Sequence, residues 1–178
     1  MLNTMYEGKF PHKRYRNTLD FLTAQITPPA KILDLGVHNP FVPYMEKAGY
    51  TVINTKGEDL DLNTEFIESV DSDVVTAFEI FEHLLSPFTV LQNIKADKLV
   101  ASIPLRLWFS AAYKSKTDSW DRHYHEFEDW QFDWLLEKAG WEIKARGKWT
   151  HPVKKIGLRP LLRLFTPRYY IVYAERKK

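Results

Sequence analysis

The sequence predicts an α/β protein built on a doubly wound, mostly parallel sheet with helices on both faces. The first observation is a set of short apolar runs at residues 31–35, 74–78 and 99–103, which are typical of strands buried on both faces. The second is the helical spacing of apolar residues in the segments before and between these runs. Because helices and strands alternate along the chain, helical crossovers are expected to join the strands.

Local signals predict the elements of the first half in order. A helix is expected before Pro28, because apolar residues recur there at helical spacing: Tyr15, Leu19, Leu22 and Ile26. Pro43 predicts the start of a second helix and Gly49 its end, and residues 51–53 follow as a strand. Thr64 predicts the cap of a short helical turn before the strand at 74–78.

In the second half, Ser86 and Pro87 predict a cap and a first helical position for a helix that runs through Ile94. A later helix carries a core stripe of Phe132, Leu135, Leu136 and Ala139. A second stripe of Phe127, Trp130 and Trp134 is expected either to pack beneath a loop or to line a pocket. Strands are expected after Gly140 and at residues 169–174.

Length and composition fit one globular domain over residues 1–178, with an N-terminal helical region at 1–29 and an insertion at 104–128. The chain has no cysteine, which excludes disulfides, thiol catalysis and cysteine metal sites. A net charge of +2 argues against dedicated nucleic-acid binding. The start of the sequence lacks the apolar region of a signal peptide, so a cytoplasmic protein is expected.

The small net charge hides two segments of opposite sign. Every charged residue from Glu58 to Glu82 is acidic, and every charged residue from Ala145 to Arg168 is basic. Within 154–168, basic residues recur every fourth position at Lys155, Arg159 and Arg163. The apolar residues Leu158, Leu161, Leu162 and Phe165 share another helical face. This segment is expected either to dock on the sheet or to make a weak contact with an anionic membrane surface.

Polar chemistry is expected where the first strand ends. Asp34 lies at the carboxyl end of that strand, and Gly36 lets the backbone pass close to a ligand. The chain continues without further glycines through Val37, His38 and Asn39. A phosphate cradle, which needs a glycine-rich turn, is therefore not expected here.

Several segments resemble class I S-adenosylmethionine-dependent methyltransferases. Asp34-Leu35-Gly36 is similar to the front half of their first motif, residues 73–84 to their fourth strand, and 99–104 to their fifth. Residues 125–141 resemble the last helix and sixth strand of that family. The resemblance implies a seven-stranded sheet, S-adenosylmethionine as cofactor, and methylation of a small metabolite or carrier-linked substrate. The alternatives are a non-catalytic binding or scaffold module and, less favoured because of the single glycine, a nucleotide-binding enzyme.

The same resemblance implies cofactor-binding residues. Asp34 and Gly36 would hold the methionine part, and Glu79 would face the same crevice. The acid that normally follows the second strand is missing, so Asn54 or Glu58 would replace it, and restoring an acid at Asn54 or Lys56 is expected to tighten binding. Asp61 and Leu62 would lie near the adenine. Each residue also has a structural alternative as a strand-end, loop or helix-start residue.

The insertion at 104–128 is expected to determine acceptor specificity, because it follows a strand at the ligand edge of the sheet. His123 and His125 are the candidate catalytic bases, needed only if the acceptor must lose a proton. Their spacing with Asp121 and Glu126 matches no strong ligand signature, so no metal is predicted, and loop-anchoring hydrogen bonds are the main alternative. His83 is expected to be structural.

Overall fold

A computed structural model of the chain describes residues 12–152 and 156–178. Its sheet has six strands in the order β2-β1-β3-β4-β6-β5. The bounds of the strands are β1 Lys31–Asp34, β2 Thr51–Asn54, β3 Val74–Phe78, β4 Lys98–Pro104, β5 Trp141–Thr150 and β6 Pro167–Arg176. The predicted α/β fold is confirmed.

The strand count and part of the direction differ from the expectation. Neighbouring strands from β2 to β4 are parallel, whereas β6 is antiparallel to both β4 and β5. The expected seventh strand is absent from the described residues. The segment between β2 and β3 forms loop and one short helix, α3 Glu65–Ser69. This segment carries seven acidic residues and few β-branched ones, a composition that disfavours another strand.

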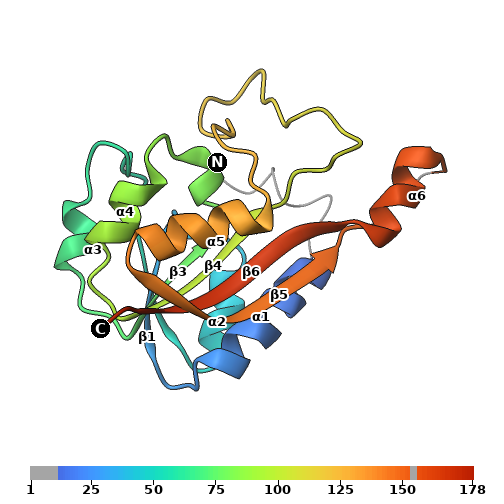
Figure 1. The fold of residues 1–178 in the computed structure, drawn as a ribbon. Helices are drawn as coiled ribbons and strands as arrows, with labels where there is room; N and C mark the ends of the chain where they lie inside the picture. Colours follow the sequence, from blue (N-terminus) through green and yellow to red (C-terminus); the bar gives the residue numbers. More distant parts are fainter. Residues whose placement is uncertain (1–11, 153–155) are drawn as a thin grey trace.

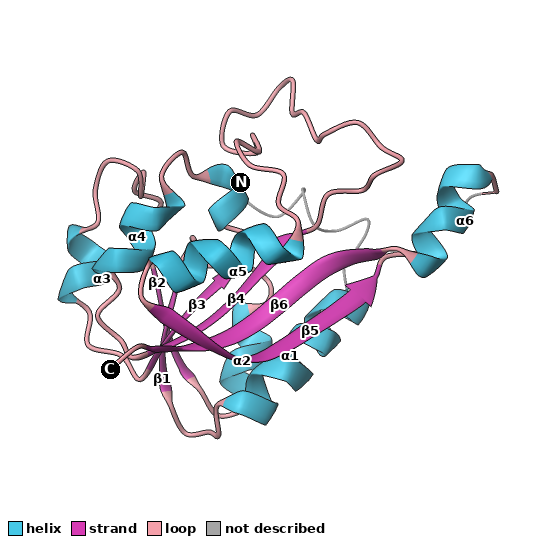
Figure 2. Cartoon of the chain, viewed as in Figure 1, coloured by secondary structure: helices cyan, strands magenta, loops and turns pink. Residues whose placement is uncertain are grey.

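Helices cover both faces of the sheet (Figures 1 and 2). On one face, α1 His12–Gln25 and α2 Val42–Lys47 bury Leu22 and Met45 against the strands. On the other face, α3, α4 Pro87–Asn93 and α5 Asp129–Lys138 bury Ile67, Leu91 and Phe132. The helices predicted from Pro43, Thr64 and Ser86 therefore form, and so does the helix that carries the core stripe.

The order of the strands brings four loops to one edge of the sheet. The chain passes from β1 outward to β2, then returns to the other side of β1 to form β3, so β1 and β3 flank the point where the order reverses. The loops that follow β1, β2, β3 and β4 all leave from the carboxyl ends of parallel strands. In open α/β sheets this is the edge where ligands bind.

The basic segment near the end of the chain forms α6 Leu158–Phe165, between β5 and β6. Figure 1 shows this helix at the far end of the two long strands, apart from the other helices. None of its residues is buried, so the expected docking on the sheet is wrong: the helix lies beyond the strands. Lys154 and Lys155 lie outside the described residues. Within the described part of the chain, no helix has the length and apolarity needed to cross a membrane.

Candidate functional site

Asp34, Gly36 and Asn54 come together at the carboxyl edge of β1 and β2. The Asn54 side-chain amide donates to Asp34 Oδ2 at 3.0 Å and to the Gly36 carbonyl at 3.1 Å. Thr55 Oγ1 accepts the Gly36 backbone N–H at 2.7 Å. The parallel register places Asp34 opposite Asn54, which is why two short strands can build this network. Three of the predicted cofactor-binding residues therefore form one hydrogen-bonded unit.

Asp34 is a buried carboxyl group in this unit, with 2% of its surface exposed. Burial raises its pKa to about 7, against the opposing effect of hydrogen bonds from Thr76, Asn54 and Asn39. The Thr76 hydroxyl donates to Asp34 Oδ1 at 2.5 Å from the neighbouring strand β3. Burial is the main effect that opposes ionisation of Asp34. A cation bound close to this carboxyl would therefore stabilise the charged form and lower its pKa.

Gly36 has a backbone conformation that side chains rarely adopt, with φ of +117°. A Cβ atom there would lie 3.2 Å from Cδ1 of Ile80, which is tighter than ordinary van der Waals contact. The loop after β1 therefore requires glycine for two reasons, backbone angle and space. The missing side chain lets Ile80 pack closely against the backbone at this edge.

Glu79 follows β3 and is held by Arg14 of α1. The Arg14 guanidinium forms an ion pair with Glu79 Oε2. Burial raises the pKa of Glu79, and the charge of Arg14 opposes this. Glu79 also has a positive φ of 59°, and its backbone N–H donates to Ser102 at 2.8 Å. A positive φ is uncommon for a residue other than glycine. Here the ion pair with Arg14 and the backbone hydrogen bond to the Ser102 carbonyl hold Glu79 in this conformation.

Asp61 and Leu62 occupy different surroundings. The two carboxylate oxygens of Asp61 accept the backbone N–H groups of Leu85 and Ser86, at 2.8 and 2.7 Å. This geometry favours the loop-anchoring alternative for Asp61, since both oxygens are engaged near the start of α4. Leu62 is 85% exposed and does not join the Asp34 unit. Their predicted place beside an adenine ring remains a prediction.

Glu58 lies in the loop after β2, and its two carboxylate oxygens differ in their surroundings. Its Oε2 accepts the Lys56 backbone N–H at 2.6 Å, whereas Oε1 is buried and has no hydrogen-bond partner among the described residues. Glu58 also lines an open depression of about 570 Å³ between this loop and α3. A buried acceptor without a donor is costly, so this oxygen is suited to a ligand hydroxyl.

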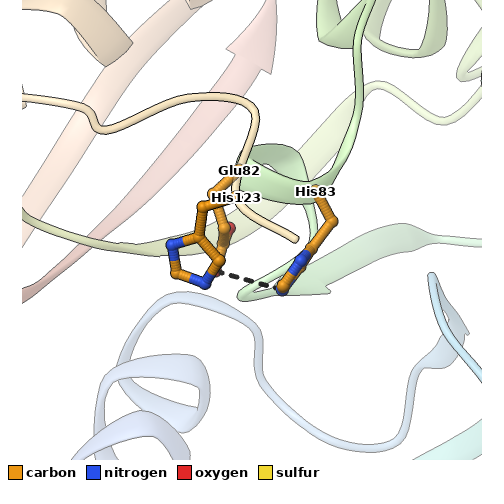
Figure 3. Close-up of side chains that lie close together, drawn as sticks. All are labelled: Glu82, His83 and His123. Atoms are coloured by element: carbon orange, nitrogen blue, oxygen red, sulfur yellow. Dashed lines mark ion pairs between the residues drawn. The ribbon is translucent and has the colours of Figure 1, made fainter. Parts of the chain in front are cut away.

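A second group of polar side chains lies after β3, where Glu82 and His83 of the 3₁₀ helix η1 Phe81–His83 meet His123 from the loop after β4 (Figure 3). Nε2 of His83 is 3.8 Å from Glu82 Oε1, and the two imidazole ring centres are 4.8 Å apart. Burial raises the pKa of Glu82 and lowers that of His123. His83, expected to be structural, accordingly belongs to a polar cluster, and its Nδ1 lies 3.0 Å from the Arg122 carbonyl.

His125, the other candidate base, lies on the same loop but not in this cluster. Its Nε2 is 3.4 Å from the Leu85 carbonyl, and its ring stacks on Phe127. Its backbone N–H and that of Tyr124 both donate to the Glu82 carbonyl, at 3.2 and 2.8 Å. The loop is thereby fixed to η1 through its backbone. Catalytic roles for His123 and His125 remain predictions.

Solved structures with the same architecture share this arrangement of strands and helices. One is the 1,6-didemethyltoxoflavin-N1-methyltransferase of Burkholderia thailandensis with bound S-adenosylhomocysteine, at 17% identity and a TM-score of 0.64, covering 92% of this chain and 78% of that one. Another is an S-adenosylmethionine-dependent methyltransferase from Mesorhizobium loti, at 14% identity and 0.58, covering 88% and 96%. This chain has the class I methyltransferase fold.

The same fold occurs in the cyclase SpnF, at 11% identity and a TM-score of 0.62, covering 92% of this chain and 81% of that one. No protein-family model and no curated protein sequence matches the chain. The likeness to the solved structures therefore concerns the methyltransferase fold, and the chemistry must be argued from the residues at the edge of the sheet.

Sequence reasoning missed three residues that complete this edge of the methyltransferase fold. Thr76 is a buried polar residue inside an apolar strand, a signal that was visible in the sequence. Glu82 lies in the segment 73–84 that carries the family resemblance, where a buried acid in an apolar run is unusual. Arg14 gave no signal, because nothing in a helical pattern indicates that one arginine reaches an acid 65 residues away.

Proposed function

We propose that this protein is an S-adenosylmethionine-dependent methyltransferase that acts on a small metabolite or a carrier-linked substrate. The observation that carries the proposal is the buried carboxyl of Asp34 beside Gly36. Both lie at the point where the strand order of a methyltransferase fold reverses. Ligands of open α/β sheets bind at this point.

The residues present fit the cofactor. S-adenosylmethionine carries positive charge on its sulfonium and ammonium groups, and the Asp34 carboxyl is a buried acid that a nearby cation would stabilise. Gly36 lets the chain turn after β1 beside the Asp34 carboxyl, through a φ that side chains rarely adopt. The unpartnered Oε1 of Glu58 supplies an acceptor for ribose hydroxyls, in place of the acid that is missing at Asn54. We propose Asp34, Gly36, Asn54, Glu58 and Glu79 as the residues around the cofactor.

Methyl transfer by direct displacement requires chiefly the alignment of donor and acceptor. The cofactor, when bound, supplies the activated methyl group. The protein's contribution is to hold the two reactants in line and to exclude water, which the loop over 105–128 would do from above the edge of the sheet. His123 and His125 stay candidates for accepting a proton, a role needed only when the acceptor must lose one.

The acceptor side of the proposed site is rich in exposed aromatic rings. The loop after β4 exposes Trp108, Tyr113, Trp120 and Tyr124. The second stripe of α5 also ends at the surface, with Trp130 and Trp134 exposed and their ring centres 4.7 Å apart. Large exposed aromatic side chains recognise flat or apolar groups. We therefore propose an acceptor that presents such a group.

Calorimetric titration of S-adenosylmethionine into the protein tests this function. We expect one site with micromolar affinity, on the order of −8 kcal/mol. Asp34→Asn should weaken binding at least tenfold, because the buried carboxylate is lost. Asp20→Asn, at an exposed acid of α1, is the matched control and should bind like the native protein. A folded native protein that gives no heat of binding would exclude the enzymatic function.

The alternative is a non-catalytic methyltransferase-fold protein that acts as a binding or scaffold module. The cyclase SpnF has this fold, so the fold alone does not dictate methyl transfer, and this alternative is retained. Incubation with S-adenosylmethionine carrying a labelled methyl group and a pool of small aromatic hydroxyl, amine and carboxylate compounds separates the two. Label in a product supports the transferase, whereas cofactor binding with no transfer to any compound favours the module.

We also propose that α6 attaches the protein to an anionic membrane surface. Its exposed apolar residues lie on one side of the helix: Leu158, Leu161, Leu164 and Phe165. Arg159 and Arg163 lie on another side, so the helix is basic and amphipathic. A protein in the cytoplasm, as the sequence predicts, meets anionic lipid headgroups, which complement these charges. Arg159 also donates to Ser110 at 2.6 Å, which links α6 to the acceptor-side loop.

A further inference from the structure

Glu82 is a buried acid with one carboxylate oxygen that lacks a hydrogen-bond partner among the described residues. Its side chain is 1% exposed, and Oε2 is buried without a hydrogen-bond partner among the described residues. A buried carboxylate that lacks partners is strongly unfavourable unless it is neutralised or binds a cation. Glu79, an acid whose charge acts on Glu82, is already paired with Arg14. Glu82 therefore has an unused acceptor atom inside the protein.

Two imidazole rings lie close to the Glu82 carboxyl group, and Nε2 of His83 is 3.8 Å from its other oxygen, Oε1. Ligand atoms of Glu82, His83 and His123 all lie within 4.8 Å of one another (Figure 3). Zinc with bonds of about 2.1 Å in tetrahedral geometry places its ligands about 3.4 Å apart. The three ligand atoms therefore need to approach one another by up to about 1.4 Å, which rotation of the His83 and His123 side chains toward the buried Glu82 can provide.

Both histidines also have partners on the ring nitrogen that a metal would not use. Nδ1 of His83 lies 3.0 Å from the Arg122 carbonyl, and Nδ1 of His123 lies 3.8 Å from Glu126 Oε1. Metal-binding histidines usually donate their second ring N–H to a carbonyl or carboxylate, which fixes the orientation of the ring. The charges of Arg168 and Arg14 favour the ionised form of Glu82, and Arg14 is already paired with Glu79.

We propose that Glu82, His83 and His123 bind a divalent transition-metal ion. Two imidazoles and one carboxylate are a ligand set that zinc accepts, with a fourth position left for water or a substrate atom. Because His123 comes from the loop after β4 and the other two ligands come from η1, the ion would fasten this loop to the edge of the sheet. The proposal goes beyond methyl transfer and does not depend on it.

Zinc chloride titrated into metal-free protein, without cofactor or substrate, tests the site. The native protein should bind one equivalent with a Kd in the micromolar range or tighter, and its Tm should rise. Protease cleavage within residues 105–128 should slow at least threefold when zinc is present, since the loop becomes anchored.

Glu82→Gln and His123→Asn should each weaken zinc binding at least tenfold and abolish both effects. Glu82→Gln keeps the shape of the buried side chain, and His123→Asn lies on a loop, so the pair guards against a variant that fails to fold. His151→Asn, at an exposed histidine beyond β5, is the matched control and should behave like the native protein. Zinc binding that is absent, or equal in all four proteins, would overturn the proposal. Either result would leave the cofactor titration unaffected.

Discussion

The side-chain amide of Asn54 donates to the buried carboxyl of Asp34 at 3.0 Å and to the Gly36 carbonyl at 3.1 Å. One amide thus joins the acid and the glycine of the proposed cofactor edge. An asparagine can make these two donations, whereas an aspartate at the same position can make neither. An acid at position 54, which is usual in the family, would therefore break this network in the present chain.

Asn54→Asp should weaken cofactor binding and lower stability at pH 8. The change removes both donations and places a second carboxylate beside Asp34, and an unsatisfied buried acceptor costs roughly 1–3 kcal/mol. The sequence alone predicted the opposite, because an acid after the second strand is usual in the family. Urea unfolding and calorimetric titration measure the two effects. Gln92→Glu, at an exposed position of α4, is the control for an amide changed to an acid, and tighter binding in Asn54→Asp would contradict the proposed role of this network.

The free energy of unfolding should depend on pH through the ionisation of Asp34. The pKa of this carboxyl is about 7 in the folded protein and near its ordinary value of 3.8 in the unfolded chain. Between these values the folded state binds the proton more tightly, so Asp34 makes the free energy of unfolding fall as pH rises, with a plateau above about 7. Asp34→Asn removes this contribution, and its stability relative to the native protein should rise from pH 4 to pH 7.

Urea unfolding of the native protein, Asp34→Asn and the control Asp20→Asn at pH 5 and pH 8 tests this point. The difference between native and Asp34→Asn should change by about 1 kcal/mol or more between the two pH values. The difference between native and Asp20→Asn should stay constant. Parallel behaviour of all three proteins would show that Asp34 ionises normally.

Gly36→Ala should destabilise the protein and prevent cofactor binding. The new Cβ meets Ile80 at 3.2 Å, and the backbone is strained at φ of +117°. Such strain costs of order 1–3 kcal/mol. Gly140→Ala provides the control, because Gly140 has a similar φ of +91° with nothing within 4 Å of its Cβ. Thermal unfolding and cofactor titration should show backbone strain in both variants and lost binding only in Gly36→Ala.

Vesicle co-sedimentation tests the membrane surface of α6. The protein should pellet with vesicles of phosphatidylcholine and phosphatidylglycerol, and less with phosphatidylcholine alone. The bound fraction should fall as salt rises, since screening weakens contact between surface charges. Replacing Arg159 and Arg163 by Glu, or Leu161 and Leu164 by Ser, should reduce pelleting severalfold.

The matched control for charge replaces Lys47 and Lys138 by Glu, at exposed positions on α2 and α5. This variant changes net charge equally and should still pellet. Equal pelleting with both lipid mixtures, or equal loss in the control, would leave α6 without a specific lipid contact. Self-association through the apolar face would instead appear as a dimer by light scattering without vesicles.

The fold was predictable because its signals are local. Apolar runs that end in Asp34 and Phe78 specify strands, and Pro43 and Pro87 fix helix starts. The seventh strand was carried over from the family resemblance, and the acidic segment from Glu58 to Asp73 does not supply it. The prediction that α6 docks on the sheet was wrong for a related reason. An amphipathic pattern reveals an apolar face but does not reveal what covers it.

The candidate site was predictable where strand ends determine it. Asp34, Gly36 and Asn54 meet because parallel pairing aligns consecutive strand ends. The ion pair between Arg14 and Glu79 and the approach of His123 to Glu82 depend on how a helix and a long loop cross the sheet. Contacts between segments that distant in the chain carry no periodic signal, so only the structure brings them together.

The central claim is that the cofactor binds at the carboxyl ends of β1 and β3, where the strand order reverses. A crystal structure of the protein with S-adenosylhomocysteine measures this most directly. The account predicts the ligand against the Gly36 backbone, with its amino-acid portion within hydrogen-bond distance of the Asp34 unit and its ribose hydroxyls near Glu58. A ligand bound elsewhere, or an empty edge at saturating ligand concentration, would contradict it.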